Sequence, residues 1–326
     1  MRNREKRYKQ IVHFVEDHIR SGEYHVGDRI PSVNAWAIRF GISRSSIFLA
    51  MNELKSRGLI EVEPSIGYFV ASSEVKIQEK VLLLFNEFTA FKEDLYNAFI
   101  EAVGDDVTTD IVFHNYNRTV FETLLRKARE KYTTYVVMPG KFDGLTKALQ
   151  DLPGRVILLD HCHPELKGQF PFIGQDFAED SYQALCQGFK KIRKYKTIIL
   201  VQREEGIEPD ERFFGIRRFC REYGFEPKKV DTVNEELLEK GALYITATDR
   251  ELVNILKKAQ TQNLTLGKDI GVVSYNETPM KEVLCGGITT LSTDFKQMGK
   301  TLASMVRNKK METISNPCTL IIRGSI

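Results

Sequence analysis

The sequence predicts an α/β chain of two parts: a winged helix-turn-helix in residues 1–71 and a two-lobed α/β domain in residues 80–326. Two short amphipathic helices and a two-stranded hairpin within residues 26–70 indicate the first part. Strand and helix patterns that alternate along the rest of the chain indicate the second part, because repeated βα units form parallel sheets with right-handed crossovers. The short polar segment at residues 72–79 is typical of a linker between domains.

The helix that would enter a DNA groove is predicted at residues 43–57. Ser43 is a good N-cap residue, and Gly58 ends the helix. Its N-terminal end stays exposed, and in helix-turn-helix proteins this end meets base edges and phosphates. The apolar stripe that would pack it consists of Ile47, Ala50, Met51 and Leu54. The other elements of this part are expected at 5–20 and 32–40 (helices) and at 59–63 and 67–71 (the strands of the wing).

The strands of the second part are expected to be buried on both faces, as in the apolar run KVLLLF at residues 80–85. About 250 residues exceed what one small sheet needs, so two similar lobes with a cleft between them are predicted. Lobe 1 would hold residues 80–172 and 292–312, and lobe 2 residues 173–291 and 313–326. The expected strands are 80–85, 110–114, 134–138, 155–160, 196–201, 242–246, 270–274 and 318–323. The expected helices are 91–103, 119–131, 142–149, 177–192, 210–223, 249–262 and 294–308.

Composition places the chain among water-soluble proteins, and we expect it in the cytoplasm. No run reaches the 18 or so apolar residues of a membrane span, and the N-terminus has no signal-peptide core. The five cysteines are odd in number and contain no CxxC pair, which fits a reducing compartment. The net charge of +3 falls entirely on residues 1–71, since the remainder carries 36 basic and 36 acidic residues. The basic cluster at the N-terminus would suit DNA phosphates, although a solvated chain end is the alternative.

The first part resembles the DNA-binding domain of GntR-family bacterial transcription regulators over about 70 residues. The resemblance implies sequence-specific operator binding by a homodimer. The residues that carry it are Tyr8, Gln10, Ile11, Ser21–Glu23, Gly27–Ser32, Gly41–Arg44, Glu53–Leu54, Arg57–Ile60 and Gly67–Val70.

The predicted DNA contacts combine this resemblance with side-chain chemistry. Arg44 can fork onto a guanine or a phosphate, and the neighbouring serines can donate to phosphates. Asn34 and Phe48 stand where the family usually has arginine, and Ile66 replaces a usual wing residue, so the usual operator sequence is not implied. The predicted DNA-binding residues are Arg4, Asn34, Ser43, Arg44, Ser45, Ser46, Gly67 and Tyr68.

The second part resembles, more weakly, the effector domain of LacI-type regulators, which has the fold of type I periplasmic sugar-binding proteins. With a GntR-type winged helix in front of it, the chain looks like the arabinose-repressor branch of the GntR family. The segments that carry the resemblance are Arg212–Ile216, Thr248–Asp249, Asp269–Asn276, Thr289–Leu291, Met298–Gly299 and Leu320–Ser325.

The effector site is expected beyond the carboxyl ends of the strands, where ligands of open α/β folds bind. The resemblance implies that Arg212, Asp249 and Asn276 hold sugar hydroxyls. Arg212 could instead pair with Glu208 or Glu211, Asp249 could cap a helix, and Phe91, like Phe172, could be core rather than a platform for a sugar ring. The predicted effector-binding residues are Glu87, Phe88, Thr89, Phe91, Asp160, Asp176, Arg212, Asp249 and Asn276; Asn86 and His161 lie at the same strand ends.

No enzyme, cofactor or metal signature is found in the sequence. GxSxG, P-loop, HExxH and GxGxxG patterns are missing, and His161-Cys162-His163 has no second ligand pair at zinc spacing. We therefore predict a regulator of carbohydrate-utilisation genes, a repressor rather than an activator, which binds operator DNA, a small sugar and a second copy of itself, and no membrane. The alternatives are a sugar-binding protein for transport or sensing, and a sugar-processing enzyme with an accessory DNA domain.

Overall fold

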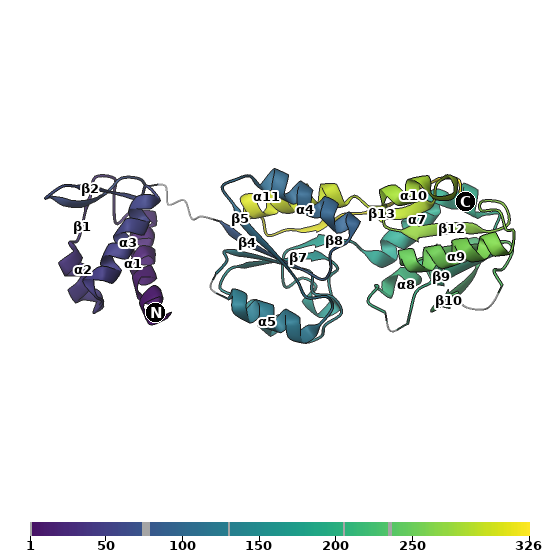
Figure 1. Cartoon of the computed structure of the whole chain (residues 1–326), viewed down its shortest axis with the longest axis horizontal. Helices are drawn as coiled ribbons and strands as arrows, with labels where there is room; N and C mark the ends of the chain where they lie inside the picture. The colour runs from purple at the N-terminus through teal and green to yellow at the C-terminus, as the bar shows by residue number, and fades with distance from the viewer. Residues whose placement is uncertain (1, 74–78, 130, 205, 234–236) are drawn as a thin grey trace. The chain divides into compact units, whose positions relative to one another are not determined.

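The computed structural model of the chain describes residues 2–73, 79–129, 131–204, 206–233 and 237–326, with the backbone alone for residues 2–7 and 56. The chain divides into two compact units, Met1–Gln78 and Glu79–Ile326 (Figure 1). Of the predicted linker, residues 74–78 lie outside the described part. No described helix combines the length and the apolar character that a membrane crossing requires.

The first unit is a winged helix-turn-helix. Its helices are α1 (Arg2–Arg20), α2 (Val33–Phe40) and α3 (Arg44–Ser56), and its strands are β1 (Arg29–Ile30), β2 (Ile60–Glu63) and β3 (Gly67–Val70). The strands form an antiparallel sheet in the order β1-β3-β2. Only β1 was not predicted, because a two-residue strand leaves no periodic pattern.

The three helices pack around Trp36, which is fully buried. Ile47, Met51 and Leu54 of α3 face the same core, so the predicted apolar stripe of α3 is confirmed. The opposite face of α3 is left free of the core, which makes it available to a partner.

The first lobe of the second unit is built on a six-stranded parallel sheet of order β14-β8-β7-β6-β4-β5. Figure 1 shows α4 and α11 together on one side of this sheet and α5 on the other, and separate apolar cores lie beneath them. The strands are β4 (Lys80–Phe85), β5 (Thr108–Phe113), β6 (Thr134–Val137), β7 (Arg155–Asp160), β8 (Phe172–Gly174) and β14 (Thr313–Ser315). The helices are α4 (Ala90–Val103), α5 (Arg118–Ala128), α6 (Thr146–Gln150) and α11 (Phe295–Arg307), with a 3₁₀ turn at Pro164–Leu166.

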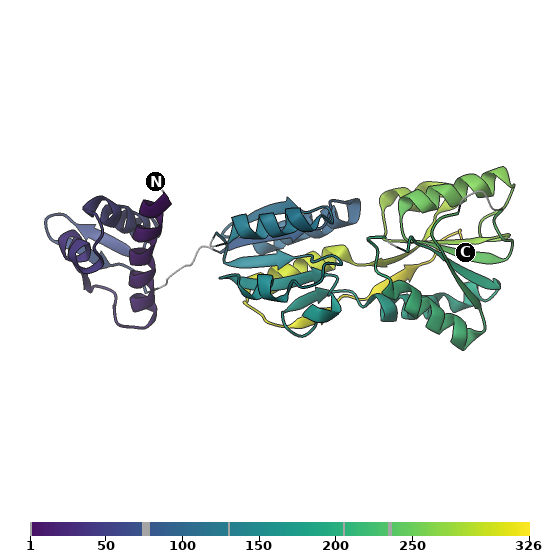
Figure 2. The same ribbon diagram turned by 90° about the horizontal axis from the view of Figure 1, so that it is seen from below.

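The second lobe repeats this plan with the sheet order β10-β9-β11-β12-β13-β15. All neighbours are parallel except β15, which runs antiparallel to β13. Helices α7 and α8 share one core with the sheet, and α9 shares another (Figure 2). The strands are β9 (Thr197–Val201), β10 (Glu226–Val230), β11 (Ala242–Thr246), β12 (Gly271–Tyr275), β13 (Thr289–Thr293) and β15 (Cys318–Ile321). The helices are α7 (Phe177–Ile192), α8 (Glu211–Tyr223), α9 (Asp249–Thr261) and α10 (Pro279–Val283), with a 3₁₀ turn at Leu284–Gly286.

The predicted α/β class with a winged helix and two parallel lobes is therefore confirmed. The expected helix at 142–149 is wrong at its start: α6 begins at Thr146, and Gly144 just before it has a φ of +70°, which a helix cannot contain. Strands β8, β10, β13 and β14 were not predicted. Because β8 and β14 pair with the first sheet, the lobe borders fall a few residues later than expected.

The chain crosses between the lobes three times: from β8 to α7, from β13 to α11 and from β14 to β15. Asn316, on the third crossing, ties all three together. Its backbone N–H donates to the Gly174 carbonyl (2.7 Å), and its side-chain amide donates to Thr293 Oγ1 (2.5 Å) and to the Asp294 carbonyl (3.0 Å). The hinge is thus a hydrogen-bonded joint, not three independent strands.

Candidate functional site

The N-terminus of α3 is organised by a serine cap. Ser43 Oγ accepts from the Ser46 backbone N–H (3.4 Å) and lies 3.1 Å from Ser45 Oγ. Arg44 and Ser45 are exposed beside it. Ser46, however, is only 2% exposed and its hydroxyl meets Ser43 Oγ at 3.0 Å. The Ser46 hydroxyl therefore completes the cap and does not have the exposure that the predicted contact with DNA assumed.

The remaining predicted DNA contacts are spread over α2 and the wing. Asn34 is exposed in the first turn of α2, and Gly67 opens β3. Tyr68 is half-buried and packs on the core, so its ring also has a structural role. Arg29 donates to the Ile66 carbonyl, and its side chain fills the space beside Gly67. The sequence did not predict that this arginine belongs to the wing. Arg4 lies in α1 among the residues whose side chains are not described.

The second unit contains a cavity of about 290 Å³ bordered by residues of both lobes. Strands of both sheets contribute residues to it from their carboxyl ends, among them β4, β7, β8, β11 and β12, and this is the position predicted from the fold. The lining residues that can bind a polar ligand are Asn86, Glu87, Thr89, Lys92, Tyr116, Asp160, His161, Gln175, Glu208, Arg212, Asp249, Asn276, Thr278 and Lys281, and the aromatic ones include Phe91, Phe177, Tyr275 and Phe295.

Three residues of this wall have a left-handed backbone although they are not glycine. The φ angles are +54° at Tyr116, +71° at Asp160 and +64° at Asn276. Such conformations cost free energy and concentrate at functional sites. Asp160 ends the buried strand β7, and Asn276 directly follows the buried strand β12. With this backbone conformation, both residues line the cavity beyond the carboxyl ends of the strands.

Arg212 lies in the wall with unusual surroundings. Its residue is 5% exposed, and its guanidinium lies 4.0 Å from the centre of the Tyr275 ring and 5.2 Å from that of Phe177. Its buried Nε and Nη1 have no hydrogen-bond partner, and no carboxylate of the described residues lies within ion-pair distance. The alternative of a salt bridge with Glu208 or Glu211 is therefore wrong; Glu211 instead binds His161 Nε2 at 3.3 Å, which lowers the pKa of the Glu211 carboxyl to about 2.

Lys281 of α10 is 1% exposed, and sequence reasoning missed it. Its ammonium binds Asp249 Oδ1 (2.8 Å) and the carbonyl oxygens of Tyr275 and Asn276 (2.7 Å each), while burial lowers its pKa. Asp249 is thus held by Lys281, and the helix cap belongs to Thr248, whose Oγ1 accepts from the Glu251 N–H.

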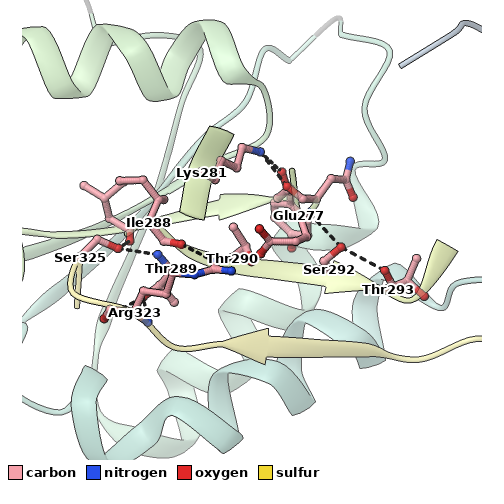
Figure 3. A network of polar contacts seen from close by, with 12 residues as sticks. Glu277, Lys281, Ile288, Thr289, Thr290, Ser292, Thr293, Arg323 and Ser325 are labelled. Atoms are coloured by element: carbon pink, nitrogen blue, oxygen red, sulfur yellow. Dashed lines mark hydrogen bonds and ion pairs between the residues drawn. The ribbon is translucent and has the colours of Figure 1, made fainter. Parts of the chain in front are cut away.

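Figure 3 shows how this wall is braced along β13. Glu277 accepts from Arg323 Nη1 (2.8 Å) and from the Thr290 hydroxyl, and its N–H donates to Ser292 Oγ (2.9 Å). Ser292 in turn donates to the Thr293 carbonyl at the hinge (3.0 Å). The segment that follows the lining residue Asn276 is therefore hydrogen-bonded to β13 and, through Ser292, to the residue at which the second crossing begins.

The first-lobe side of the cavity has a second buried lysine, also missed. Lys92 of α4 donates to Asn86 Oδ1 (2.5 Å) and lies 3.3 Å from Glu87 Oε1, which also accepts from the Tyr116 hydroxyl (3.2 Å). Burial, together with the Glu87 charge, raises the pKa of Tyr116. A lysine inside an amphipathic helix gives no sequence signal of such a role, because most helical lysines are solvated.

Two predicted effector residues lie outside the cavity. Phe88 is 54% exposed and packs edge-on against Phe113. Asp176 is exposed and caps α7 by accepting from the Glu179 N–H (3.0 Å). Neither residue lines the cavity, because successive residues at a strand end point in different directions. Glu87, Thr89, Phe91, Asp160, Arg212, Asp249 and Asn276 do line the cavity, and Phe91 also packs on Phe295.

His161 and His163 do not form a shared ligand pair. His161 binds Glu211, whereas His163 Nε2 lies 3.2 Å from Asp143 Oδ1, in the segment between β6 and α6. Glu165 completes a group with Asp143 and His163, but its two carboxylate oxygens already accept the N–H groups of Gly144 and Leu145.

Comparison with known proteins agrees with the two-part architecture. Residues 7–70 match the gntR family of bacterial regulatory proteins, and residues 190–326 match the periplasmic binding protein-like domain. The HTH-type transcriptional regulator YdfD of Bacillus subtilis is 44% identical over 74 residues, which is 23% of this chain and 15% of that protein. YdcR of Escherichia coli is 33% identical over 72 residues, or 22% and 15%. These curated relatives are thus matched over 15% of their length only.

Solved structures resemble the second unit. A LacI family transcriptional regulator from Silicibacter pomeroyi superposes with a TM-score of 0.64 and 14% identity, covering 76% of this chain and 98% of that one. A periplasmic binding protein/LacI regulator from Alkaliphilus metalliredigens, complexed with D-xylulofuranose, gives 0.60 and 11% with the same coverage. At these identities the likeness shows the fold.

The fold and the matched families thus agree on a chain of two parts, a winged helix-turn-helix that matches a family of bacterial regulatory proteins and a periplasmic-binding-protein-like domain. The first unit is therefore similar to gntR-family DNA-binding domains, and the second unit has the fold of the periplasmic binding protein-like domain.

Proposed function

We propose that the chain represses carbohydrate-utilisation genes and that a small neutral sugar, bound in the 290 Å³ cavity, controls it. The observation that carries the proposal is Arg212, a buried guanidinium with two donors unpartnered at the cavity wall. A buried donor without an acceptor destabilises the free protein. A ligand that supplies acceptors to Arg212 removes this penalty, which favours its binding. The structure of the Alkaliphilus relative with D-xylulofuranose supports a furanose or similar sugar.

The rest of the wall favours a polyhydroxyl ligand over an anion. Three buried cations, Lys92, Arg212 and Lys281, face four carboxylates, those of Glu87, Asp160, Glu208 and Asp249. A hydroxyl group can donate to a carboxylate and accept from a cation at once, whereas a phosphate would meet the four carboxylates unfavourably. Aromatic rings in the same wall suit the apolar face of a sugar.

The regulatory step follows from the two-state logic of allostery. In the proposal, a homodimer binds a pseudo-palindromic operator, and sugar binding changes the arrangement of the lobes and releases the DNA. A coupling free energy of about 1–3 kcal/mol between the two sites is enough for such a switch. The cytoplasm, where operator DNA resides, is the proposed compartment.

The test begins with a thermal-shift panel on the purified full chain, with pentoses, hexoses and their phosphates. We expect a neutral monosaccharide to raise the melting temperature and its phosphate to do so less. A gel shift with promoter DNA should then show release of the DNA by that sugar. Stabilisation by phosphates alone would overturn the assignment of a neutral sugar, and tighter DNA binding with the sugar would overturn repression by the free protein. Size-exclusion chromatography with light scattering tests the dimer.

A further inference from the structure

The exposed face of α3 carries a large aromatic side chain. Phe48 is 49% exposed and lies one helical turn after Arg44 and one turn before Asn52, so all three share one face. Arg44 and Asn52 are exposed as well. The core of the domain is closed on the opposite face of α3, so Phe48 is not required for packing.

About half of the Phe48 surface is left in water, and removing this apolar surface from water would be favourable. That free energy is gained when the face meets a surface with an apolar feature. Here the surface is DNA, since residues 7–70 are a gntR-family domain and α3 is the helix that such domains present to the groove. The apolar feature of the major groove is the 5-methyl group of thymine, which phenylalanine can contact.

We propose that Phe48 selects a thymine in each operator half-site by packing against its 5-methyl group. Its polar neighbours fit the same partner: Arg44 supplies a fork for a guanine or phosphate, and Asn52 an amide that can pair with adenine. A protein partner is a poorer match, because the face around Phe48 is polar and basic, with Arg44, Asn52 and Lys55 all exposed. The inference rests on the operator binding of the proposed function and names one base of the operator.

The first experiment selects operators from a random double-stranded library with three full-length proteins: wild type, Phe48→Ala and Leu49→Ala. Leu49 is the matched control, because it is equally exposed at 50% and adjacent in sequence, but turned about 100° from Phe48 around the helix. We expect wild type and Leu49→Ala to enrich a thymine at one position of each half-site, and Phe48→Ala to lose that preference alone.

The second experiment replaces that thymidine with deoxyuridine, which removes only the methyl group. Wild-type affinity should fall roughly fourfold per half-site, the equivalent of one buried methyl group, while Phe48→Ala should bind both duplexes equally. The wild-type measurement needs no variant, so a wild-type protein that is indifferent to the methyl group overturns the thymine contact even where Phe48→Ala folds poorly by circular dichroism.

The outcomes separate the two levels of the claim. A wild-type motif in which deoxyuridine is harmless at every thymine, or a motif that Phe48→Ala leaves unchanged, overturns the role of Phe48 and leaves operator binding intact. No motif with wild type overturns sequence-specific binding itself, and the thymine contact with it.

Discussion

Replacing Arg212 with methionine separates a binding residue from a structural one. The substitution keeps an unbranched, flexible side chain and removes the charge and both unpartnered donors. If Arg212 serves a ligand, the free protein gains by losing a buried unpaired charge and loses its contacts with Tyr275 and Phe177.

These two effects are of similar size and opposite sign. Leaving a buried donor unsatisfied costs about 1–3 kcal/mol, and a desolvated cation–π contact contributes about 2 kcal/mol. The free energy of unfolding should therefore change by no more than about 1 kcal/mol, which corresponds to roughly 2–4 °C in melting temperature for a domain of this size. Sugar affinity should fall by about 3 kcal/mol, or more than a hundredfold, since two charge-assisted hydrogen bonds are lost.

The assay is thermal denaturation of Arg212→Met with and without the sugar found in the panel, followed by calorimetric titration. Arg218→Met is the control on the same helix, because Arg218 is an exposed arginine paired with Glu179 and Glu222, and it should leave sugar affinity unchanged. A loss of several kcal/mol in stability with intact sugar binding would refute the reasoning, because that is the behaviour of a structural ion pair.

Three further predictions follow from the same contacts. Burial raises the pKa of Asp180 to about 6, above the unfolded value of about 4, so the free energy of unfolding of the wild type should fall as the pH rises from about 4 to about 6. In urea denaturation, Asp180→Asn should be more stable than the wild type at pH 7 by on the order of 2 kcal/mol and no more stable at pH 4. Arg44→Ala should weaken operator binding at least tenfold in a gel shift and leave the sugar-induced thermal shift unchanged; equal operator affinity would remove Arg44 from the DNA contact. Asn316→Ala removes two hinge hydrogen bonds and should lower stability by about 1–3 kcal/mol and alter the sugar response, whereas exposed Asn308→Ala should do neither.

The sequence correctly predicted the cavity-lining residues whose place depends only on their position along a strand. Asp160 and Asn276 were identified because the carboxyl ends of parallel strands meet at one edge of a sheet, and Arg212 through a family resemblance. Phe88 and Asp176 miss the cavity by one residue each, since neighbouring positions at a strand end point to opposite sides. Ser46 is less exposed than expected because a serine in a first turn can complete the cap as easily as meet solvent.

The residues that were missed owe their place to tertiary burial. Lys92 and Lys281 lie in helices whose sequence pattern is that of any surface helix, and only packing against the sheets shows them to be 3% and 1% exposed. Gln175 was missed because it follows β8, a strand of three residues with no detectable periodicity.

Gln175 also shows why a small ligand is sufficient to act on the hinge. Its backbone lies on the first crossing, and its side-chain N–H donates to Asp160 Oδ1 in the cavity (2.7 Å). Its side-chain Oε1 accepts from the Cys318 thiol (3.2 Å), at the start of β15 where the third crossing ends. A ligand hydroxyl that binds the Asp160 carboxylate therefore competes with, or strengthens, a bond to the hinge itself. One such bond contributes about 1–3 kcal/mol when a charge is involved, which equals the coupling that a regulator of this kind requires. In the proposed mechanism, the lobes can therefore change their arrangement without any change inside either sheet, because the cavity and the crossings share the same polar groups.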